Sequence, residues 1–509
     1  MSLTMSPAEI VAEAEASGQP GLLARHDSWE RVRLGDVAEI LNGSPFSSHY
    51  FNKDRLGLPL IRIRDVGSTD PETYYSGDYE DKFIIQSGDI LIGMDGDFRV
   101  ARWRGQPALL NQRVCKITVV GKLYDEQFLL LALQGYLDAI NQRTSAITVK
   151  HLSSRSVGEI PLPLPPLAEQ RRIAAGLDDH LSRLDAATNY FEAGLRRTNT
   201  LSESVTNRAV SGKLVDFHSP GTEKDLHSAV LAHRSLVVPK RRLRPSAMGA
   251  HFPVTVPAHW NMVALDELAT VIEYGTSAKT RPQEQPDDVP VLRMGNIQDG
   301  GLDFSSLKYL PASHKDVDKL TLADGDLLFN RTNSAELVGK TAVYRAKLGP
   351  MTFASYLIRC QFAPGVIPEW VSLVINSAYG RQYISAVSSQ QVGQANVNGS
   401  KLAAMPIPLP STEEQESILA AAGEYKSKAS HFSSILAMSR SKSMTMRRSL
   451  LTAAFSGKLV PQNPEDEPAS VLLERIDAEQ LVAKKQRKVR RAPNTRFTPK
   501  QSNNAPSGI

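Results

Sequence analysis

The residues Pro161-Leu-Pro-Leu-Pro-Pro-Leu-Ala-Glu-Gln-Arg-Arg-Ile173 return later in the chain as Pro406-Ile-Pro-Leu-Pro-Ser-Thr-Glu-Glu-Gln-Glu-Ser-Ile418. Three prolines, a Glu-Gln pair and the last isoleucine coincide without a gap. The same offset of 245 relates Ser211-Gly-Lys-Leu214 to Ser456-Gly-Lys-Leu459. An internal repeat of this length indicates a chain built from two copies of one architectural unit.

Each copy predicts an extended lead-in followed by a long helix. Alternating prolines lack amide donors and push the preceding residue toward extended geometry. In the second copy Ser411 and Glu414 have the spacing of a capping box, and in the first copy Pro165-Pro166 can start the helix with Glu169 in its first turn. Gly212 and Gly457 are stop signals. The intervening helix would span on the order of 65–70 Å.

Apolar residues in these helices recur at alternating spacings of three and four, which is typical of a seam that packs on another helix. The first helix has Ile173, Leu177, Leu181, Leu184, Phe191 and Leu195; the second has Ile418, Ala422, Tyr425, Ala429, Phe432, Leu436, Met446, Leu450 and Ala453, interrupted by Ser439 and Ser443. A rod with one narrow stripe cannot bury it alone. The two repeats are therefore expected to pack antiparallel on each other; the alternative is a long helix packed on a globular core.

A second set of echoes precedes each proline run. Trp29-Glu-Arg-Val-Arg-Leu34 matches Trp260-Asn-Met-Val-Ala-Leu265 at an offset of 231, and the segment at Gly88 matches that at Gly325 at 237. The two cysteines, Cys115 and Cys360, differ by 245 and are interpreted as one buried, apolar position seen twice rather than as a disulfide or nucleophiles. The growing offset predicts insertions between strands, in loops of the kind that vary binding specificity.

The strand signals are short and punctuated by turns, at Leu60–Arg64, Asp89–Ile92 and Val114–Val119, and one helix is expected in each copy, near Asp125–Asn141 and Pro368–Ile384. The predicted fold class is α+β: two repeated α/β domains with mostly antiparallel sheets, separated by two long antiparallel helices forming a coiled coil with pseudo-two-fold symmetry. The predicted segments are an N-terminal arm (1–28), domain 1 (29–160), lead-in and helix (161–214), linker (215–258), domain 2 (259–404), lead-in and helix (405–459), a helical and basic segment (460–491) and a disordered tail (492–509).

Composition sets broad limits on function. The 509 residues carry 59 Lys+Arg against 54 Asp+Glu, a net charge of +5 that permits nucleic-acid binding without establishing it. Basic runs follow both long helices, at Lys240–Arg244 and Lys484–Arg491. No run reaches the ~18 apolar residues of a membrane span. The N-terminal residues lack the pattern of a signal peptide, so a cytoplasmic protein is expected.

Motifs for catalysis were sought and not found. Gly339-Lys340-Thr341 resembles the end of a phosphate-binding loop, but Ser334 stands where the first glycine should be. The 11 histidines lack metal-ligand spacing. Asp95 and Asp97 are close together but fit a turn better than a catalytic pair. The sequence therefore predicts a chain that is not an enzyme by itself and binds no cofactor or metal.

The repeated proline run with its Glu-Gln pair, the two Ser-Gly-Lys-Leu blocks and the upstream Gly88-Asp-Ile-Leu91 and Gly325-Asp-Leu-Leu328 resemble the specificity subunit of type I restriction-modification systems. The resemblance covers Trp29 to about Arg491. It implies two target-recognition domains, each reading one half of a split DNA sequence, with the helices setting the unread spacer. It also implies two methyltransferase subunits, which use S-adenosylmethionine, and usually two restriction subunits, which use ATP and Mg²⁺.

Base discrimination requires forked donors and amides, because arginine pairs with guanine and asparagine or glutamine with adenine. The candidate DNA-binding residues in domain 1 are Arg62, Arg64, Arg99, Arg102, Arg104 and Lys150. Those in domain 2 are Arg293, Asn296, Arg331, Asn333, Lys340, Gln391, Asn396 and Asn398. Two other hypotheses stay open at this point: a self-contained DNA methyltransferase or nuclease, and a coiled-coil spacer protein without a role on DNA.

Overall fold

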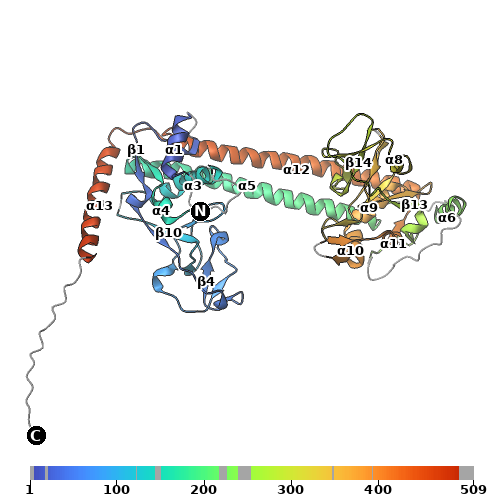
Figure 1. Ribbon diagram of the computed structural model, residues 1–509, viewed down its shortest axis with the longest axis horizontal. Helices are drawn as coiled ribbons and strands as arrows, with labels where there is room; N and C mark the ends of the chain where they lie inside the picture. The colour runs from blue at the N-terminus through green and yellow to red at the C-terminus, as the bar shows by residue number, and fades with distance from the viewer. Residues whose placement is uncertain are drawn as a thin grey trace, which may run out of the picture. The chain divides into compact units, whose positions relative to one another are not determined.

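The computed structural model describes residues 5–17, 21–121, 123–143, 151–216, 226–238, 254–346, 349–391 and 394–491, without the side chains of 142–143, 390–391 and 482–491. The chain divides into two compact units that are discontinuous in sequence. Unit 1 contains residues 1–190 and 439–509, and unit 2 contains residues 191–438. Each unit therefore holds one predicted domain together with part of both long helices, whose elements are labelled in Figure 1.

Unit 1 contains two sheets of four and five strands, besides a two-stranded pair described below. A four-stranded antiparallel sheet has the order β2 (Ala38–Asn42), β10 (Val114–Val119), β7 (Ile90–Gly93) and β8 (Val100–Arg102). A five-stranded sheet has the order β3 (Phe51–Asn52), β5 (Tyr74–Tyr75), β4 (Leu58–Ile61), β9 (Ala108–Leu110) and β6 (Ile84–Ile85). Only β4 and β9 pair in parallel among these named strands. The helix α3 (Glu126–Arg143) lies at the predicted place.

Unit 2 repeats the plan. Its four-stranded antiparallel sheet has the order β13 (Ala269–Tyr274), β22 (Leu357–Phe362), β18 (Leu327–Asn330) and β20 (Thr341–Val343). Smaller sheets join β17 (Lys308–Pro311), β14 (Asp288–Leu292) and β21 (Thr352–Phe353), and β19 (Thr332–Asn333), β24 (Gln394–Asn396) and β23 (Ser389–Gln391). A two-stranded sheet joins β15 (Ile297–Gln298) to β16 (Gly301–Leu302), and α8 spans Lys315–Leu320. The single helix predicted over 368–384 is instead two, α9 (Pro368–Asn376) and α10 (Ala378–Val387), because Ser377 caps the second through Gly380 N at 3.2 Å.

The strand register corrects the equivalence of the two cysteines. Cys115 pairs with Ile92, and Cys360 pairs with Leu327, the counterpart of Ile90. The ion pairs Lys116–Asp89 and Arg359–Asp326 agree with this, because the aspartates differ by 237 and the cations by 243. The cysteines therefore stand two residues apart on the same face of equivalent strands, and the offset reaches 245 only after these strands. Both are buried, as predicted, and burial raises the pKa of Cys115 to about 12.

The proline runs form edge strands, as their missing amide donors require. β11 (Pro161–Leu164) pairs antiparallel with β1 (Glu30–Arg33), and β25 (Pro406–Leu409) pairs with β12 (Asn261–Ala264) in the same register. Leu162 and Leu164 are fully buried between the prolines. The repeated stretch thus closes each domain before its long helix begins.

The Glu-Gln pair of the motif is a structural lock. The Gln170 side chain accepts from the Asp125 amide at 2.8 Å and donates to the Pro165 carbonyl at 2.9 Å. Gln415 does the same with the Ile367 amide and the Pro410 carbonyl, at 2.8 and 3.1 Å. Both glutamines are fully buried. A buried amide at this position satisfies backbone groups that would otherwise lack partners, which explains its repetition.

The glutamate beside it holds the tryptophan that starts each domain. Trp29 Nε1 donates to Glu169 at 3.1 Å, and Trp260 Nε1 donates to Glu414 at 3.2 Å. Ser411 and Glu414 also form the predicted capping box, with N–O distances of 3.2 and 3.1 Å. The motif therefore fixes the domain, the proline strand and the helix start in one cluster.

The long helices are α5 (Leu167–Val210) and α12 (Thr412–Phe455), each of 44 residues. In unit 1 their segments pack antiparallel, because Asp185 pairs with Arg447 and Thr188 lies 3.2 Å from Ser443. Ile173, Leu177 and Leu181 of the predicted α5 seam are buried, in one hydrophobic cluster with Phe455 of α12 and with Phe128 of the domain core.

The predicted seam of α12 is partly wrong. Tyr425, Phe432 and Met446 are 50%, 52% and 57% exposed, whereas Ser443, predicted to interrupt the seam, is 8% exposed. Its hydroxyl is within hydrogen-bond reach of the Leu184 carbonyl as well as Thr188. Small hydroxyl side chains that can bond locally fit a close helix contact, and the larger apolar side chains lie outside it.

Each long helix ends two residues before its predicted glycine, Gly212 or Gly457, whose φ is +67° or +68°. A further helix then packs on the short helix of a domain: α6 (Leu226–Val237) on α7 (Leu265–Leu268) in unit 2, and α13 (Ala469–Arg491) on α2 (Leu34–Val37) in unit 1. The first lies within the predicted linker, and the second lies within the predicted helical and basic segment. The tail 492–509 and the basic run 240–244 lie outside the described residues.

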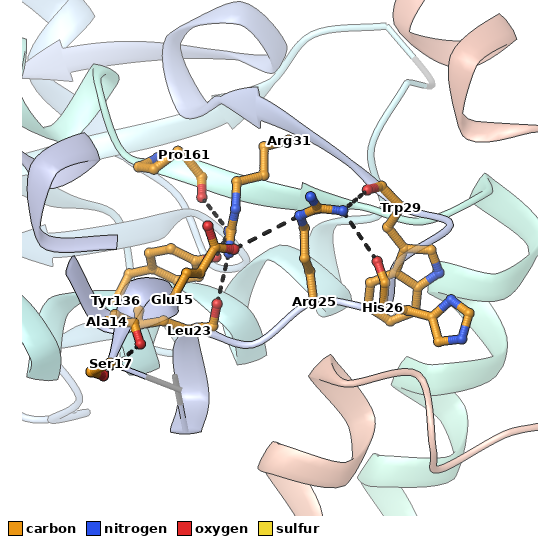
Figure 2. Close-up of polar contacts among 10 residues, drawn as sticks. All are labelled: Ala14, Glu15, Ser17, Leu23, Arg25, His26, Trp29, Arg31, Tyr136 and Pro161. Carbon is orange, nitrogen blue, oxygen red and sulfur yellow. Dashed lines mark hydrogen bonds and ion pairs between the residues drawn. The ribbon is translucent and has the colours of Figure 1, made fainter. Parts of the chain in front are cut away.

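The N-terminal arm is particular to unit 1. Its helix α1 (Pro7–Ala16) buries Ile10, Val11 and Ala14 in the unit 1 core. Figure 2 shows Arg31 donating to Glu15 at 2.6 Å and to the Leu23 and Pro161 carbonyls at 2.8 and 3.1 Å, with Tyr136 beside it. The corresponding residue of unit 2, in the same strand register, is Met262.

Candidate nucleic-acid interface

One polar edge is built by the same backbone contacts in both domains. We call it the bridge site: Asn42, Met94, Asp95, Arg113 and His151 in unit 1, and Tyr274, Arg331, Thr332, Tyr356 and Asn396 in unit 2. In unit 1 it forms where the chain leaving β7 meets the segment before helix α4 (Ser154–Gly158). In unit 2 the corresponding segment precedes α11 (Gly399–Ala403).

The bridge site of unit 1 joins an acid, an arginine and a histidine. Asp95 lies 2.6 Å from His151 Nδ1 and 3.4 Å from Arg113 Nε. Arg113 Nη1 is 3.4 Å from the same histidine nitrogen. The Arg113 side chain is 51% exposed, whereas Asp95 is 16% exposed. A half-buried carboxylate therefore orients an exposed guanidinium.

The bridge site of unit 2 contains a different set of groups. Arg331 lies over the Tyr274 ring, 4.9 Å from its centroid, and is 3.4 Å from the Ser355 carbonyl and 3.5 Å from Asn396 Oδ1. Asn396 Nδ2 donates to Thr332 Oγ1 at 2.8 Å. Tyr356 is 47% exposed beside this group. Among the described residues no carboxylate pairs with Arg331.

The backbone under the two edges is the same. Met94 N bonds to Arg113 O at 2.9 Å and Leu152 N to Met94 O at 2.8 Å; the corresponding bonds in unit 2 are Arg331 N to Tyr356 O at 3.0 Å and Val397 N to Arg331 O at 2.9 Å. Ser153 and Asn398 cap equivalent short helices. The frame is therefore fixed while its side chains differ.

Most predicted DNA-binding residues of domain 1 are exposed. Arg62 and Arg64 lie at a short 3-10 turn after β4, Arg99 precedes β8 and Arg104 follows it, and all four are exposed. Arg102 is engaged internally, with the Gly88 carbonyl at 2.8 Å and Glu126 at 3.1 Å. Lys150 lies outside the described residues. The five described side chains make no hydrogen bond or ion pair with a residue of the bridge site.

The predicted residues of domain 2 divide into two groups. Arg331 and Asn396 meet in the bridge site, and Asn333 lies on the neighbouring strand β19. Lys340 is 3.9 Å from Asp299, and Asn398 uses its side chain to cap α11. Gln391 belongs to β23, but its side chain is not described. Arg293 is half-buried, and its Nε has no hydrogen-bond partner among the described residues.

The Asn296 side chain is buried in the loop after β14. It is 3% exposed, its Oδ1 accepts from the Arg293 amide at 2.9 Å, and its Nδ2 donates to the Asp303 and Ser306 carbonyls. Its counterpart Asp65 accepts from the Arg62 amide at the same distance. Burial raises the pKa of Asp65 although that amide bond lowers it. We assign Asn296 to holding the loop, because each of its amide groups already has a backbone partner.

Reasoning from the sequence missed Arg113, His151, Tyr274 and Tyr356. Each is distant in sequence from the strand it meets, so only the pairing of strands brings it to the edge. The available signal was the offset between repeats, which places unlike residues at equivalent positions. Among the described residues no group of three or more metal-ligating side chains occurs, and no helix there is long and apolar enough to cross a membrane.

Comparison with known proteins agrees with this two-domain arrangement. The family model of the type I restriction modification DNA specificity domain matches residues 26–190 and again 257–422. The specificity subunit of the type I restriction enzyme EcoBI from Escherichia coli is 31% identical over 479 residues, covering 91% of this chain and 94% of that protein. The EcoKI specificity subunit of Escherichia coli strain K12 is 24% identical, covering 90% and 96%.

A solved chain from the type I R-M system, described in terms of complex assembly and conformational transition, superposes with a TM-score of 0.56 at 17% identity, covering 84% of this chain and 98% of that chain. At that identity the likeness supports the fold alone. The family model matches both domains, and the relatives are similar over most of this chain. This chain therefore belongs to the family of type I restriction-modification specificity subunits.

Proposed function

We propose that this chain is the sequence-specific DNA-binding subunit of a type I restriction-modification complex, with each domain reading one half of a split target. The observation that carries the proposal is the bridge site, where one backbone frame occurs twice with different polar groups. Two similar readers in one chain suit a target of two unlike halves. Phosphate contacts by exposed arginines such as Arg62, Arg64 and Arg104 would add affinity without sequence choice.

The long helices are proposed to set the separation of the half-sites. A helix of 44 residues has a length of about 66 Å at 1.5 Å per residue. This is roughly two turns of DNA and gives an upper limit to the separation. Within unit 1 the contact between the two helices includes the hydroxyl side chains of Ser443 and Thr188, which favours a close approach.

The chain is proposed to be non-catalytic and to direct adenine methylation and restriction by its partners. Those are two methyltransferase subunits, which hold S-adenosylmethionine, and two restriction subunits, which hold ATP and Mg²⁺. Support for a protein partner comes from exposed apolar side chains on α12, where Tyr425, Phe432 and Met438 are 50%, 52% and 59% exposed. Such side chains favour association with another apolar surface.

The proposal is tested by single-molecule mapping of N6-methyladenine in the host genome with and without the gene. Deletion is expected to remove methylation at one split motif and to leave other motifs unchanged. Replacing residues 29–160 with the corresponding domain of another specificity subunit should then change one half of the motif only. A change in both halves, or methylation of DNA by the purified chain without partners, would contradict it.

A further inference from the structure

We infer that the bridge site is where each domain reads a base pair, and that Arg113 and Arg331 are its specificity-determining residues. The expected ligand is the major-groove edge of a guanine, which presents two acceptors to a forked donor. This inference rests on the proposed function and deepens it. It places the reading arginine at two different positions of one frame.

A recognition domain with variable specificity is expected to keep its backbone hydrogen bonds and to vary its side chains. Both properties meet at the bridge site. The amide bonds around Met94 and Arg331 correspond one to one. Yet Met94 corresponds to Arg331, Asp95 to Thr332 and His151 to Asn396. Strand β2 contacts helix α4 through Asn42, which donates to the Ser154 hydroxyl at 2.9 Å. At the same place in unit 2, β13 contacts α11 through the Gly399 amide, which donates to the Tyr274 hydroxyl at 2.7 Å.

Two pairs of polar positions that hold the fold keep the same contacts in both repeats. Gln170 and Gln415 make the same pair of backbone hydrogen bonds, and Asp89 and Asp326 pair with a cation from the same place on the neighbouring strand. Divergence is therefore not general among the polar residues of the two repeats. The bridge site is therefore a place where the side chains differ between the repeats although the backbone hydrogen bonds are kept.

In unit 1 the geometry favours Arg113 as the reader. Its Nε faces the Asp95 carboxylate at 3.4 Å, and its side chain is 51% exposed. A carboxylate behind the Nε atom orients the guanidinium fork, so less conformational freedom is lost when a base binds. Nη2 has no hydrogen-bond partner among the described residues, and Nη1 has only His151, at 3.4 Å.

In unit 2 the guanidinium belongs to Arg331, which follows β18, whereas Arg113 of unit 1 precedes β10. Arg331 is held by the Tyr274 ring and by weak contacts of 3.4 and 3.5 Å to the Ser355 carbonyl and Asn396. Stacking leaves the edge of a guanidinium able to donate. Tyr356, 47% exposed, stands at the position of Arg113, and its carbonyl accepts from the Arg331 amide at 3.0 Å. The two domains therefore present one oriented arginine each, from different strands.

The test uses the full chain assembled with its methyltransferase subunits. N6-methyladenine is mapped on random-sequence DNA for wild type, R113Q, R113K and R331Q. R113Q should relax one base pair of one half-site by on the order of 10- to 100-fold in the preference between bases, and R331Q should relax one base pair of the other half-site. R113K keeps the charge but lacks the fork, so it should relax the same base pair as R113Q.

Arg33→Gln is the matched control, because Arg33 is 61% exposed and also pairs with a carboxylate, Asp36. It should reproduce the wild-type motif. If R113Q or R331Q lowers methylation uniformly and keeps the motif, the arginine contacts phosphate and the inference is overturned. If wild type gives no split motif, the proposed function itself fails. A wild-type split motif that both variants reproduce would reject the bridge site alone.

Discussion

Glu169 and Glu414 occupy the same position of the two repeats, yet their pKa values shift in opposite directions. Burial raises the pKa of Glu169, and the hydrogen bonds from Gln462 and Trp29 do not reverse it. Burial also acts to raise the pKa of Glu414, but hydrogen bonds from His259, Trp260 and the Ser411 amide together outweigh it, and the pKa falls. The same glutamate of the motif therefore lies in two different environments, because its hydrogen-bond partners differ between the two domains.

The largest effect is expected where the two junctions agree. Trp29 is 1% exposed and Trp260 is 6% exposed. Trp29→Ala and Trp260→Ala each remove a buried indole and should lower the free energy of unfolding by about 3–5 kcal/mol. Trp260 also makes an edge-to-face contact with Trp370 at 5.6 Å, which adds roughly 0.5–1.5 kcal/mol. Denaturant unfolding, monitored by amide hydrogen exchange in each unit, measures the loss for each variant. A loss below about 1 kcal/mol in either variant would show that the two tryptophans do not have the same role.

A smaller effect should separate the domains. Arg31→Met gives unit 1 the residue that unit 2 has at this position, Met262, and leaves the Leu23 and Pro161 carbonyls without their donor. The expected cost is about 1–3 kcal/mol, confined to the arm. Hydrogen exchange of residues 7–16 should speed up while unit 2 is unchanged.

Arg25→Met is the matched control, since Arg25 lies beside the same Glu15 at a longer 3.8 Å and bonds outward to the Trp29 carbonyl (Figure 2). It should loosen α1 less than Arg31→Met does. Equal acceleration in both variants would show that charge on the arm, rather than the Arg31 contacts, holds it.

The smallest effect is the pH dependence of the two glutamates. Glu169 has a folded pKa above its usual value of 4.5, so it lowers stability at neutral pH, and this cost disappears as the pH falls through the folded pKa toward 4.5. Glu414 has a folded pKa below 4.5, so it stabilises above pH 4.5 and loses that contribution as the pH falls through the folded pKa.

Comparing wild type with Glu169→Gln and Glu414→Gln between pH 3.5 and 7 isolates each group, since glutamine does not titrate. On acidification the difference in unfolding midpoint should move in favour of wild type for Glu169→Gln and against it for Glu414→Gln. Shifts of the same sign would mean that the two junctions share one environment.

The repeat, the extended proline strands, both long helices with their terminal glycines, and the capping box at Ser411 and Glu414 could all be predicted from the amino-acid sequence. These follow from local chemistry: missing amide donors, helix propensity, caps and left-handed glycine. The family resemblance rests on the same local motifs.

The contacts between side chains that are distant in sequence could not be predicted and depend on tertiary packing. The exposure of Tyr425 and Phe432, the seam position of Ser443 and the register of the cysteines depend on partners far away in sequence. The bridge site depends on them most, because Asp95 is separated from His151 by 56 residues and Arg331 from Asn396 by 65. Periodicity predicts that a face is apolar, but it cannot choose between two neighbouring stripes of one helix or pair one strand with another, since those choices are made by packing.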